Sequence, residues 1–273
     1  MKEITTEELS NLVVLQPSTT DKVDPLILVD IRPNSEFISE HIIGSINAPT
    51  TQLSKSTENL KDFFISFEKN FENKKEIPIF QWRNIGTVCI IGDLKITKKL
   101  MQVLYLEKKS KSVFFCNFTF KQFKKDYPYL VTSDSFRKHQ FPTHILKNLY
   151  LGSKETAEDK FVLKSIGIDC IINCTRDIPC YFENENFLYH QIPMEDDPSQ
   201  KLNLDSTIEF IEKNISTKKI LIHCVAGRSR SVAVCIQYLK KFHQKNFVET
   251  HEFLRKKRPL ISLNSGFVEQ LKE

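Results

Sequence analysis

The chain has 273 residues, of which 40% are hydrophobic and 27% are charged, and its formal net charge is +5 at pH 7. This length and composition fit a soluble, globular protein of two ordinary domains. No apolar run reaches the length of a membrane span, and the acidic first ten residues lack the apolar core of a targeting segment. Seven cysteines without paired metal-ligand spacing predict reduced thiols in a cytoplasmic or nuclear protein.

The mild positive charge comes mostly from scattered lysines. Two lysine-rich stretches, 95–99 and 108–111, lack interleaved arginine or aromatic residues. They therefore fit a solvated face better than a surface for nucleic acid or acidic partners. We expect neither a nucleic acid nor a membrane as a partner.

The first half alternates short apolar runs with helical patterns. The runs that fit buried parallel strands lie at 26–30, 87–91 and 113–115. The helical patterns lie at 35–41, 59–73, 96–106 and 118–127. Residues 46–49 return to an extended state, because the residue before a proline avoids the helical region. This alternation predicts a parallel α/β sheet with flanking helices over residues 1–132.

A polar stretch without clear periodicity then separates two halves, and we place a linker at 133–142. The alternating pattern restarts over residues 143–273. The predicted strands of this half lie at 144–152, 168–174, 187–192 and 220–222. Its predicted helices lie at 204–214, 231–242, 247–256 and 266–271.

The segment 223–231 places one cysteine, five intervening residues and one arginine between a buried strand and a helix. Such a loop can turn several backbone N–H groups, and the positive end of the helix, toward an anion. Gly227 lets the backbone curl without a steric penalty, and the planar guanidinium of Arg230 can grip two phosphate oxygens. A buried, inert Cys224 would leave this arginine and glycine unexplained. The segment therefore predicts a thiolate nucleophile that faces a bound phosphate.

Other residues of the segment receive supporting roles. The hydroxyl of Ser231 can donate a hydrogen bond to the sulfur when the sulfur leaves in a second step. His223 is better placed to brace the loop than to move protons, because it precedes the nucleophile on a strand. The phosphate-binding loop itself consists of Val225, Ala226, Gly227, Arg228 and Ser229.

A leaving alcohol or phenol needs a proton donor on a neighbouring loop. Three acids, Glu195, Asp196 and Asp197, follow an apolar strand. By composition alone they fit a solvated acidic loop equally well. The chemistry expected at Cys224 favours a functional role, without choosing among the three.

The second half resembles the dual-specificity protein phosphatases. The matching residues are at 149–153, 167–168, 172–175, 192–193, 196, 223–231, 258–259 and 264–271. The resemblance implies that Asp196, three residues after Pro193, is the general acid and base, and that Asn173 supports the loop from a neighbouring strand. It implies transfer of the phosphoryl group from a phosphoprotein to Cys224 and hydrolysis by water, with no metal and no cofactor. The substrates would carry phosphotyrosine or phosphoserine/threonine.

The first half resembles a rhodanese-like domain through residues 28–33, 36–37 and 41–49. Active rhodaneses carry a cysteine loop directly after the strand that corresponds to 87–91. This chain has Gly-Asp-Leu-Lys there, so the resemblance implies a non-catalytic domain. We expect Asp30 and Arg32 to hold this fold together by a salt bridge or a capping contact.

This domain order is that of the MAP kinase phosphatases and of a related pseudophosphatase, which makes a MAP kinase a candidate partner. The arginine cluster that docks the kinase in that family is replaced at 50–61 by two lysines. Two alternatives stay open: a pseudophosphatase-like adaptor that binds phosphosites, and a phosphatase for a non-protein substrate. Retention of Cys224 and Arg230 argues against the adaptor. Cys174, on a strand expected near the loop, is a candidate disulfide partner for an oxidised Cys224.

Overall fold

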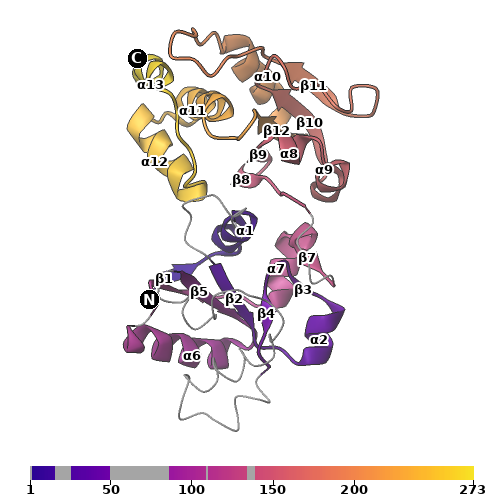
Figure 1. The fold of residues 1–273 in the computed structure, drawn as a ribbon, viewed down its shortest axis with the longest axis vertical. Helices are drawn as coiled ribbons and strands as arrows, with labels where there is room; N and C mark the ends of the chain where they lie inside the picture. Colours follow the sequence, from indigo (N-terminus) through magenta and orange to yellow (C-terminus); the bar gives the residue numbers. More distant parts are fainter. Residues whose placement is uncertain (1, 16–25, 50–85, 109, 134–138) are drawn as a thin grey trace, which may run out of the picture. The chain divides into compact units, whose positions relative to one another are not determined.

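The computed structural model describes residues 2–15, 26–49, 86–108, 110–133 and 139–273 (Figure 1). The chain forms two compact units, Met1–Arg137 and Lys138–Glu273, and the boundary between them falls within the linker placed at 133–142. The helix predicted at 59–73 and the stretch 50–61 lie outside the described residues.

A parallel sheet forms the centre of the first unit. In spatial order its strands are β1 (Lys2–Ile4), β6 (Ser112–Cys116), β5 (Thr87–Ile91), β2 (Leu26–Asp30) and β4 (Ile46–Asn47). All neighbouring strands run parallel. Every residue of β2 and β5 is buried, as short apolar runs covered on both faces require. The parallel sheet predicted for this half is therefore confirmed.

The helices of the first unit are α1 (Thr6–Val14), α2 (Asn34–Ser39), α6 (Leu94–Glu107) and α7 (Phe120–Asp126). Smaller elements are the 3-10 turn η2 (Pro128–Leu130) and the antiparallel pair β3 (His41–Ile42) and β7 (Val131–Thr132). The sequence analysis did not predict β1 or α1. A capping box between Thr5 and Glu8 begins α1, and this local signal could have located the helix.

A buried ion pair holds the end of β2. Arg32 donates from Nη2 to Oδ2 of Asp30 at 2.6 Å and from Nε to both carboxylate oxygens. The Asp30 side chain is fully buried, and the same guanidinium donates to the carbonyl of Glu40 and lies 3.4 Å from the ring centroid of Phe120. The expected salt bridge is confirmed, and its extra contacts offset the cost of burying two charges.

The connection from β5 to α6 carries no anion-binding loop. It consists of Gly92 and Asp93, and the Asp93 carboxylate accepts from the N–H groups of Lys95 and Ile96 at the start of the helix. An acid thus takes the position where a helix N-terminus would otherwise attract an anion. Cys89 lies inside the strand, where a hydrogen bond with Cys116 and burial raise the pKa of its thiol. That this domain is non-catalytic stays a prediction.

The second unit is built on a mixed sheet. In spatial order its strands are β11 (Leu188–Gln191), β10 (Ile168–Asn173), β12 (Lys219–His223), β9 (Leu149–Gly152) and β8 (Thr143–Leu146). The first four run parallel, and β8 joins β9 as an antiparallel neighbour. The strand expected at 144–152 is therefore a hairpin of two strands. The helices are α8 (Lys154–Ala157), α9 (Lys160–Ile166), α10 (Asp205–Ile215), α11 (Arg230–His243), α12 (Phe247–Lys257) and α13 (Ser265–Lys272).

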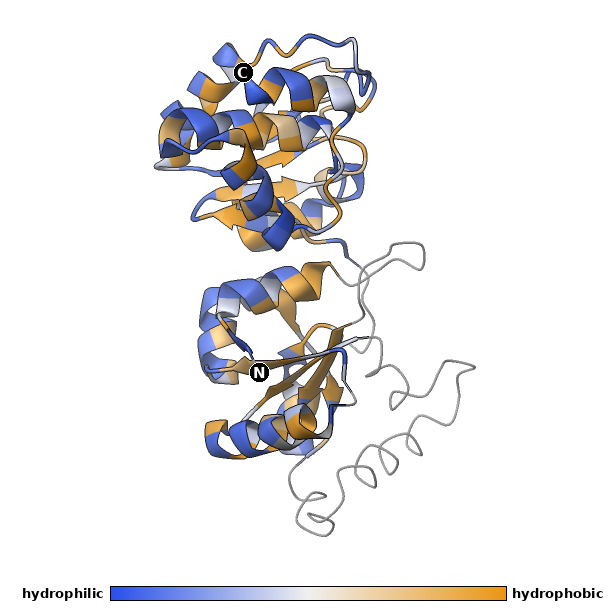
Figure 2. Ribbon diagram, turned by 90° about the vertical axis from the view of Figure 1, so that its left-hand side faces the viewer, coloured by the Kyte–Doolittle hydropathy of each residue, from blue (hydrophilic) through white to orange (hydrophobic). Residues whose placement is uncertain are grey.

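Helix α11 lies at the centre of the second unit. It packs on β12 and β9, and α10, α12 and α13 pack against it (Figure 1). Side chains alternate between the two faces of a strand, so Ile220 and Ile222 join the α11 core while Leu221 lies near Thr156 of α8. Figure 2 shows the resulting apolar strands within more polar helices. Helices α8 and α9 were not predicted, because they are too short to show a clear period.

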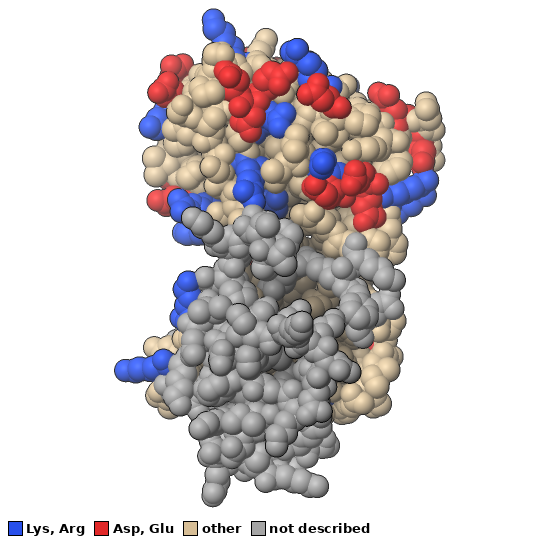
Figure 3. Space-filling model, in the orientation of Figure 1, with Lys and Arg blue, Asp and Glu red and all other residues tan. Residues whose placement is uncertain are grey.

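Charges are mixed on the surface of the second unit. On the face drawn in Figure 3, basic and acidic side chains of this unit are interspersed. Such a face lacks the one-sided positive potential of a nucleic-acid footprint. Within the described ranges, every helix is too short or too polar to cross a membrane.

Candidate active site

The cysteine segment lies at the carboxyl ends of parallel strands. Strand β12 ends at His223, the loop 224–229 follows, and α11 begins at Arg230. In open α/β sheets this edge is where ligands bind. The buried strand and the helix hold the loop at both ends, as the sequence predicted.

Two backbone contacts fix the flanks of the loop. The carbonyl of Val225 accepts from the Lys154 N–H at 2.9 Å, at the start of α8. The carbonyl of Arg228 accepts from the Ser262 N–H at 2.8 Å. Both donors lie far from the loop in sequence, so only the tertiary fold brings them to it.

Arg258 fixes the middle of the loop. Its guanidinium donates from Nε to the carbonyl of Gly227 at 2.8 Å and from Nη2 to the carbonyl of Ala226 at 3.2 Å. Nη1 donates to Oγ1 of Thr143 at 3.0 Å. Arg258 is 6% exposed, so these hydrogen bonds compensate for the loss of hydration around its charge.

These contacts decide where the loop N–H groups point. Four successive carbonyls, from Val225 to Arg228, face donors outside the loop. In a trans peptide the N–H points opposite to the carbonyl, so the N–H groups of residues 226–229 turn toward the inside of the loop. Gly227 has φ +65, and a Cβ there would overlap the carbonyl oxygen of Gly152. The loop is therefore a concave set of donors suited to an oxyanion.

Cys224 lies at the base of this loop. It is 2% exposed, and its Sγ is 3.2 Å from Oγ of Ser231 in the first turn of α11. Ser231 is fully buried, so its hydroxyl is committed to this contact. The structure thus places these two predicted site residues together.

Arg230 faces the same space. Nη1 donates to the carbonyl of Met194 at 3.3 Å, and Nε lies 4.0 Å from Oδ2 of Asp196. Nε is buried, and in the described part of the chain it has no hydrogen-bond partner. A buried guanidinium edge without a partner is costly unless a ligand oxygen accepts from it.

Of the three acids proposed as proton donors, Asp196 is the one that meets the loop. Its Oδ1 accepts from Oγ of Ser229 at 2.6 Å and from Nδ2 of Asn264 at 2.8 Å. Glu195 instead pairs with Arg176 at 3.4 Å, and both side chains are exposed.

Asp197 serves the turn that follows. Two hydrogen bonds from Ser199 hold its carboxylate and lower its pKa. Asp197 is therefore ionised at neutral pH and orders the turn; it does not act as a proton donor there. The geometry agrees with the choice of Asp196 that the family resemblance implied.

His223 is a neutral structural residue. It is 1% exposed, and burial lowers its pKa to about 4. Its Nδ1 lies 3.3 Å from the carbonyl of Cys224, so at neutral pH the ring donates to the start of the loop. This arrangement fits the bracing role predicted for it.

Asn173 is the last residue of β10 and pairs with His223 of the neighbouring strand. Its side chain donates to the carbonyl of Ile178 and accepts from the N–H and hydroxyl of Thr175, which orders the turn after β10. The support that it gives to the cysteine loop passes through the backbone, where Asn173 pairs with His223 in the sheet. The resemblance implied support but could not tell a backbone contact from a side-chain contact.

Two further cysteines lie close to Cys224. The N–H of Cys174 donates to the carbonyl of His223 at 2.9 Å, so Cys174 directly follows the last register pair of β10 and β12. Burial, then the nearby Cys224, raises the pKa of Cys174 and also that of Cys235. Both are thiols at neutral pH. The disulfide suggested for Cys174 stays a prediction.

Sequence reasoning assigned no role to three residues that shape this site: Arg258, Ser262 and Asn264. Arg258 and Asn264 belong to stretches that carried the family resemblance, but nothing local reveals their contacts. An arginine directly before Pro259, after an amphipathic helix, would ordinarily be taken as solvated. Its burial becomes visible only when the helix is packed on the sheet.

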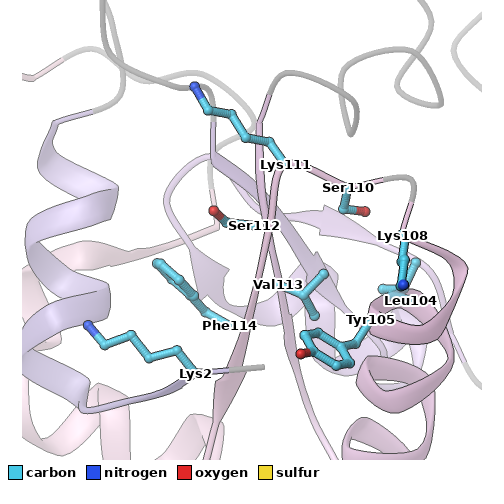
Figure 4. Close-up of a pocket in the computed structure, with 9 residues that line it drawn as sticks. All are labelled: Lys2, Leu104, Tyr105, Lys108, Ser110, Lys111, Ser112, Val113 and Phe114. Atoms are coloured by element: carbon cyan, nitrogen blue, oxygen red, sulfur yellow. The ribbon is translucent and has the colours of Figure 1, made fainter.

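A cavity of about 370 Å³ lies elsewhere, in the first unit (Figure 4). Its lining residues are Lys2, Leu104, Tyr105, Lys108, Ser110, Lys111, Ser112, Val113 and Phe114. They include three lysines but no cysteine and no acid. The lining therefore offers neither a thiol nor a carboxyl group, the two groups that Cys224 and Asp196 bring to the site in the second unit.

Comparison with protein families gives two matches along the chain. Residues 149–273 match the dual specificity phosphatase catalytic domain, and residues 13–125 match the rhodanese-like domain. The first match contains every residue of the cysteine loop and Asp196. The second contains the buried Asp30–Arg32 pair.

Individual relatives agree with these matches. The chain is similar to human Dual specificity protein phosphatase 16, with 28% identity over 294 residues that cover 98% of this chain and 43% of that protein. It is similar to human Dual specificity protein phosphatase 14, with 37% identity over 131 residues, 46% of this chain and 65% of that protein. The chain thus spans less than two thirds of the length of either relative. A crystal structure of human DUSP28 is similar at 27% identity, with a TM-score of 0.45 over 48% of this chain and 90% of that chain.

The first prediction concerns Arg258. Arg258→Lys keeps the charge but removes the planar fork, so the two loop carbonyls lose their shared donor. We expect the affinity for inorganic sulfate, measured by calorimetry, to fall about tenfold, which corresponds to about 1.4 kcal/mol. The matched control is Arg255→Lys on the exposed side of the same helix, where no change is expected. Equal sulfate affinity in the two variants would contradict the role of Arg258.

The second prediction concerns His223 and pH. Its pKa in the folded protein is about 4, below the ordinary value of 6.5, so the unfolded chain binds the proton first as pH falls. Its contribution to stability is complete above pH 6.5 and is lost between pH 6.5 and about 4, at up to about 1.4 kcal/mol per pH unit. Urea denaturation of His223→Gln should show a smaller loss of stability over this range than the parent protein. The control His243→Gln, at an exposed position, should follow the parent.

Proposed function

Because the chain carries a rhodanese-like domain over residues 13–125 and a dual-specificity phosphatase catalytic domain over residues 149–273, we propose that it is a phosphoprotein phosphatase. It hydrolyses phosphotyrosine and phosphoserine/threonine through a phosphocysteine intermediate. The observation that carries this proposal is the geometry of the cysteine loop. Four of its carbonyls accept hydrogen bonds from donors outside the loop, so its N–H groups turn inward above Cys224 at the base.

In the first step the phosphate binds to the inward N–H groups of the loop and to the guanidinium of Arg230. A phosphate oxygen there would satisfy the buried Nε that lacks a partner. The Cys224 thiolate attacks phosphorus and forms an S–P bond, while the bond from phosphorus to the leaving oxygen breaks. Asp196 transfers a proton to that oxygen, so the alcohol or phenol leaves neutral.

In the second step a water molecule attacks the phosphocysteine. Asp196, now a carboxylate, takes a proton from the water as its oxygen bonds to phosphorus. The S–P bond breaks and the sulfur leaves as a thiolate. The Ser231 hydroxyl, 3.2 Å from Sγ, can donate to the developing charge on sulfur. Phosphate is released, and Cys224 and Asp196 return to their starting states.

Two substitutions test this function. Cys224→Ser removes the nucleophile and should abolish turnover of an aryl phosphate and of a phosphotyrosine peptide. Asp196→Asn keeps the size of the side chain but cannot supply the proton, so turnover should fall about 100-fold or more. Release of phosphate is the measured quantity. Full activity of Cys224→Ser, or binding of the phosphopeptide by the parent protein without any turnover, would contradict the proposal.

The finer question is which phosphoprotein is the substrate. The two domains occur in the order that MAP kinase phosphatases show, and this supports a phosphorylated MAP kinase. The stretch 50–61, where a kinase-docking cluster is expected in that family, lies outside the described residues. A trapping experiment with Cys224→Ser should retain the doubly phosphorylated kinase and release the unphosphorylated form. Equal retention of both forms, or retention of neither, would remove MAP kinase as the substrate.

A further inference from the structure

The start of helix α13 meets the general-acid loop. Asn264 is the N-cap of α13, and its Oδ1 accepts from the N–H of Phe267 at 2.9 Å. Its Nδ2 donates to Oδ1 of Asp196 at 2.8 Å. Because the cap requires an oxygen on one side, the orientation of the amide is determined, and its NH₂ group must face the acid.

A second donor reaches the same oxygen. The hydroxyl of Ser229 donates to Oδ1 of Asp196 at 2.6 Å, and it accepts from the backbone N–H of Asn264 at 3.4 Å. The Asn264 N–H thus orients the hydroxyl, which leaves its proton directed at Asp196. Two donors on Oδ1 disfavour a proton there, because an O–H would compete with both of them.

The other carboxylate oxygen faces the phosphate site. Oδ2 of Asp196 lies 4.0 Å from Nε of Arg230, on the side where a phosphate ester would bind. When Asp196 is protonated, the proton therefore belongs on Oδ2. From there it can be transferred to the leaving oxygen without breaking either hydrogen bond to Oδ1.

The rest of the acid loop is tied to the same helix. A Cβ at Gly266 would overlap the carbonyl of Pro198, so the loop backbone packs directly on α13 at this position. One turn further, Gln270 donates to the carbonyl of Gln200 at 2.9 Å and accepts from the N–H of Leu202 at 2.8 Å. The acid loop is thus held along α13 on both sides of Pro198.

From this geometry we propose that Asn264, together with Ser229, is a positioning residue that reserves Oδ2 of Asp196 as the oxygen that carries the proton. The inference rests on the proposed phosphatase function, and it deepens that function by naming what orients the general acid. Asn264 itself touches neither the phosphate nor the nucleophile in this arrangement. Its effect passes through Asp196 and therefore depends on how much the leaving group needs a proton.

The test compares two aryl phosphates. Phenyl phosphate has a poor leaving group that needs protonation, whereas 2,4-dinitrophenyl phosphate releases a stable phenolate without it. Asn264→Ser keeps an N-cap for α13 but lacks the NH₂ donor. We expect kcat/KM for phenyl phosphate to fall about tenfold, the loss that corresponds to one hydrogen bond to a charged group. The kcat/KM for dinitrophenyl phosphate should change less than about twofold, because kcat/KM reports the steps up to release of the leaving group and not the second step that both substrates share.

A matched control is available on the preceding helix. Asn246 is the N-cap of α12, and its side chain accepts from Glu249 N–H in a capping box. Asn246→Ser is the same substitution at the same kind of position, and both substrates should keep the parent turnover. A second variant, Asn264→Asp, also keeps the cap but has no N–H group to donate to Asp196, so the loss should again fall on phenyl phosphate and spare dinitrophenyl phosphate.

The double variant Asp196→Asn/Asn264→Ser completes the test. Because Asn264 acts through Asp196, the double variant should lose no more activity than Asp196→Asn alone. An equal loss on both substrates in the two Asn264 variants, or additive losses in the double variant, would overturn the inference while leaving the phosphatase function intact. A parent protein that turns over neither aryl phosphate would instead contradict the function itself.

Discussion

The rest of the site depends on the hydrogen bonds that hold four backbone carbonyls of the cysteine loop outward. A buried guanidinium from Arg258 accounts for two of the four anchored carbonyls, and backbone N–H groups of Lys154 and Ser262 account for the others. Without these partners the peptide planes could rotate, and the N–H groups would no longer converge. The preorganised donors then do not need to reorient when charge develops on phosphate, which is where electrostatic catalysis gains most.

The same principle extends to Asp196, the proposed general acid. Three segments that are distant in sequence, the acid loop, the cysteine loop and the start of α13, meet at Oδ1 of Asp196. Both donor side chains make a second hydrogen bond. Asn264 caps α13, and the Ser229 hydroxyl accepts from the backbone N–H of Asn264. A side chain that makes two hydrogen bonds has few rotamers available. The Asn264 and Ser229 side chains are therefore fixed, and they in turn orient the Asp196 carboxyl group. The first unit shows a related pattern at Asp30 and Arg32, which holds the end of β2.

The sequence predicted the central strands and the long helices well, because β2, β5 and β12 are uninterrupted apolar runs and α11 has a broad apolar face. It missed β1, whose three residues form a strand only through pairing with β6. It missed α8 and α9, which are too short to show a clear period. For Asn173 the resemblance implied support of the loop without naming the contact, and the structure pairs its backbone with His223 while its side chain orders a neighbouring turn.

The sequence by itself singled out Cys224 and Arg230 as the proposed nucleophile and phosphate-binding arginine, because they stand in one short segment whose chemistry depends on local spacing. It also determined the alternation that makes two α/β domains, since hydrophobic periodicity is a local property. The residues alone left three adjacent acids open, and the family resemblance implied Asp196. The tertiary structure shows that Asp196 contacts the loop and which residues brace the loop. Arg258 lies 34 positions from Cys224, and Asn264 lies 68 positions from Asp196. Contacts over such separations arise from packing helices on a sheet, and no short-range pattern in the chain encodes them.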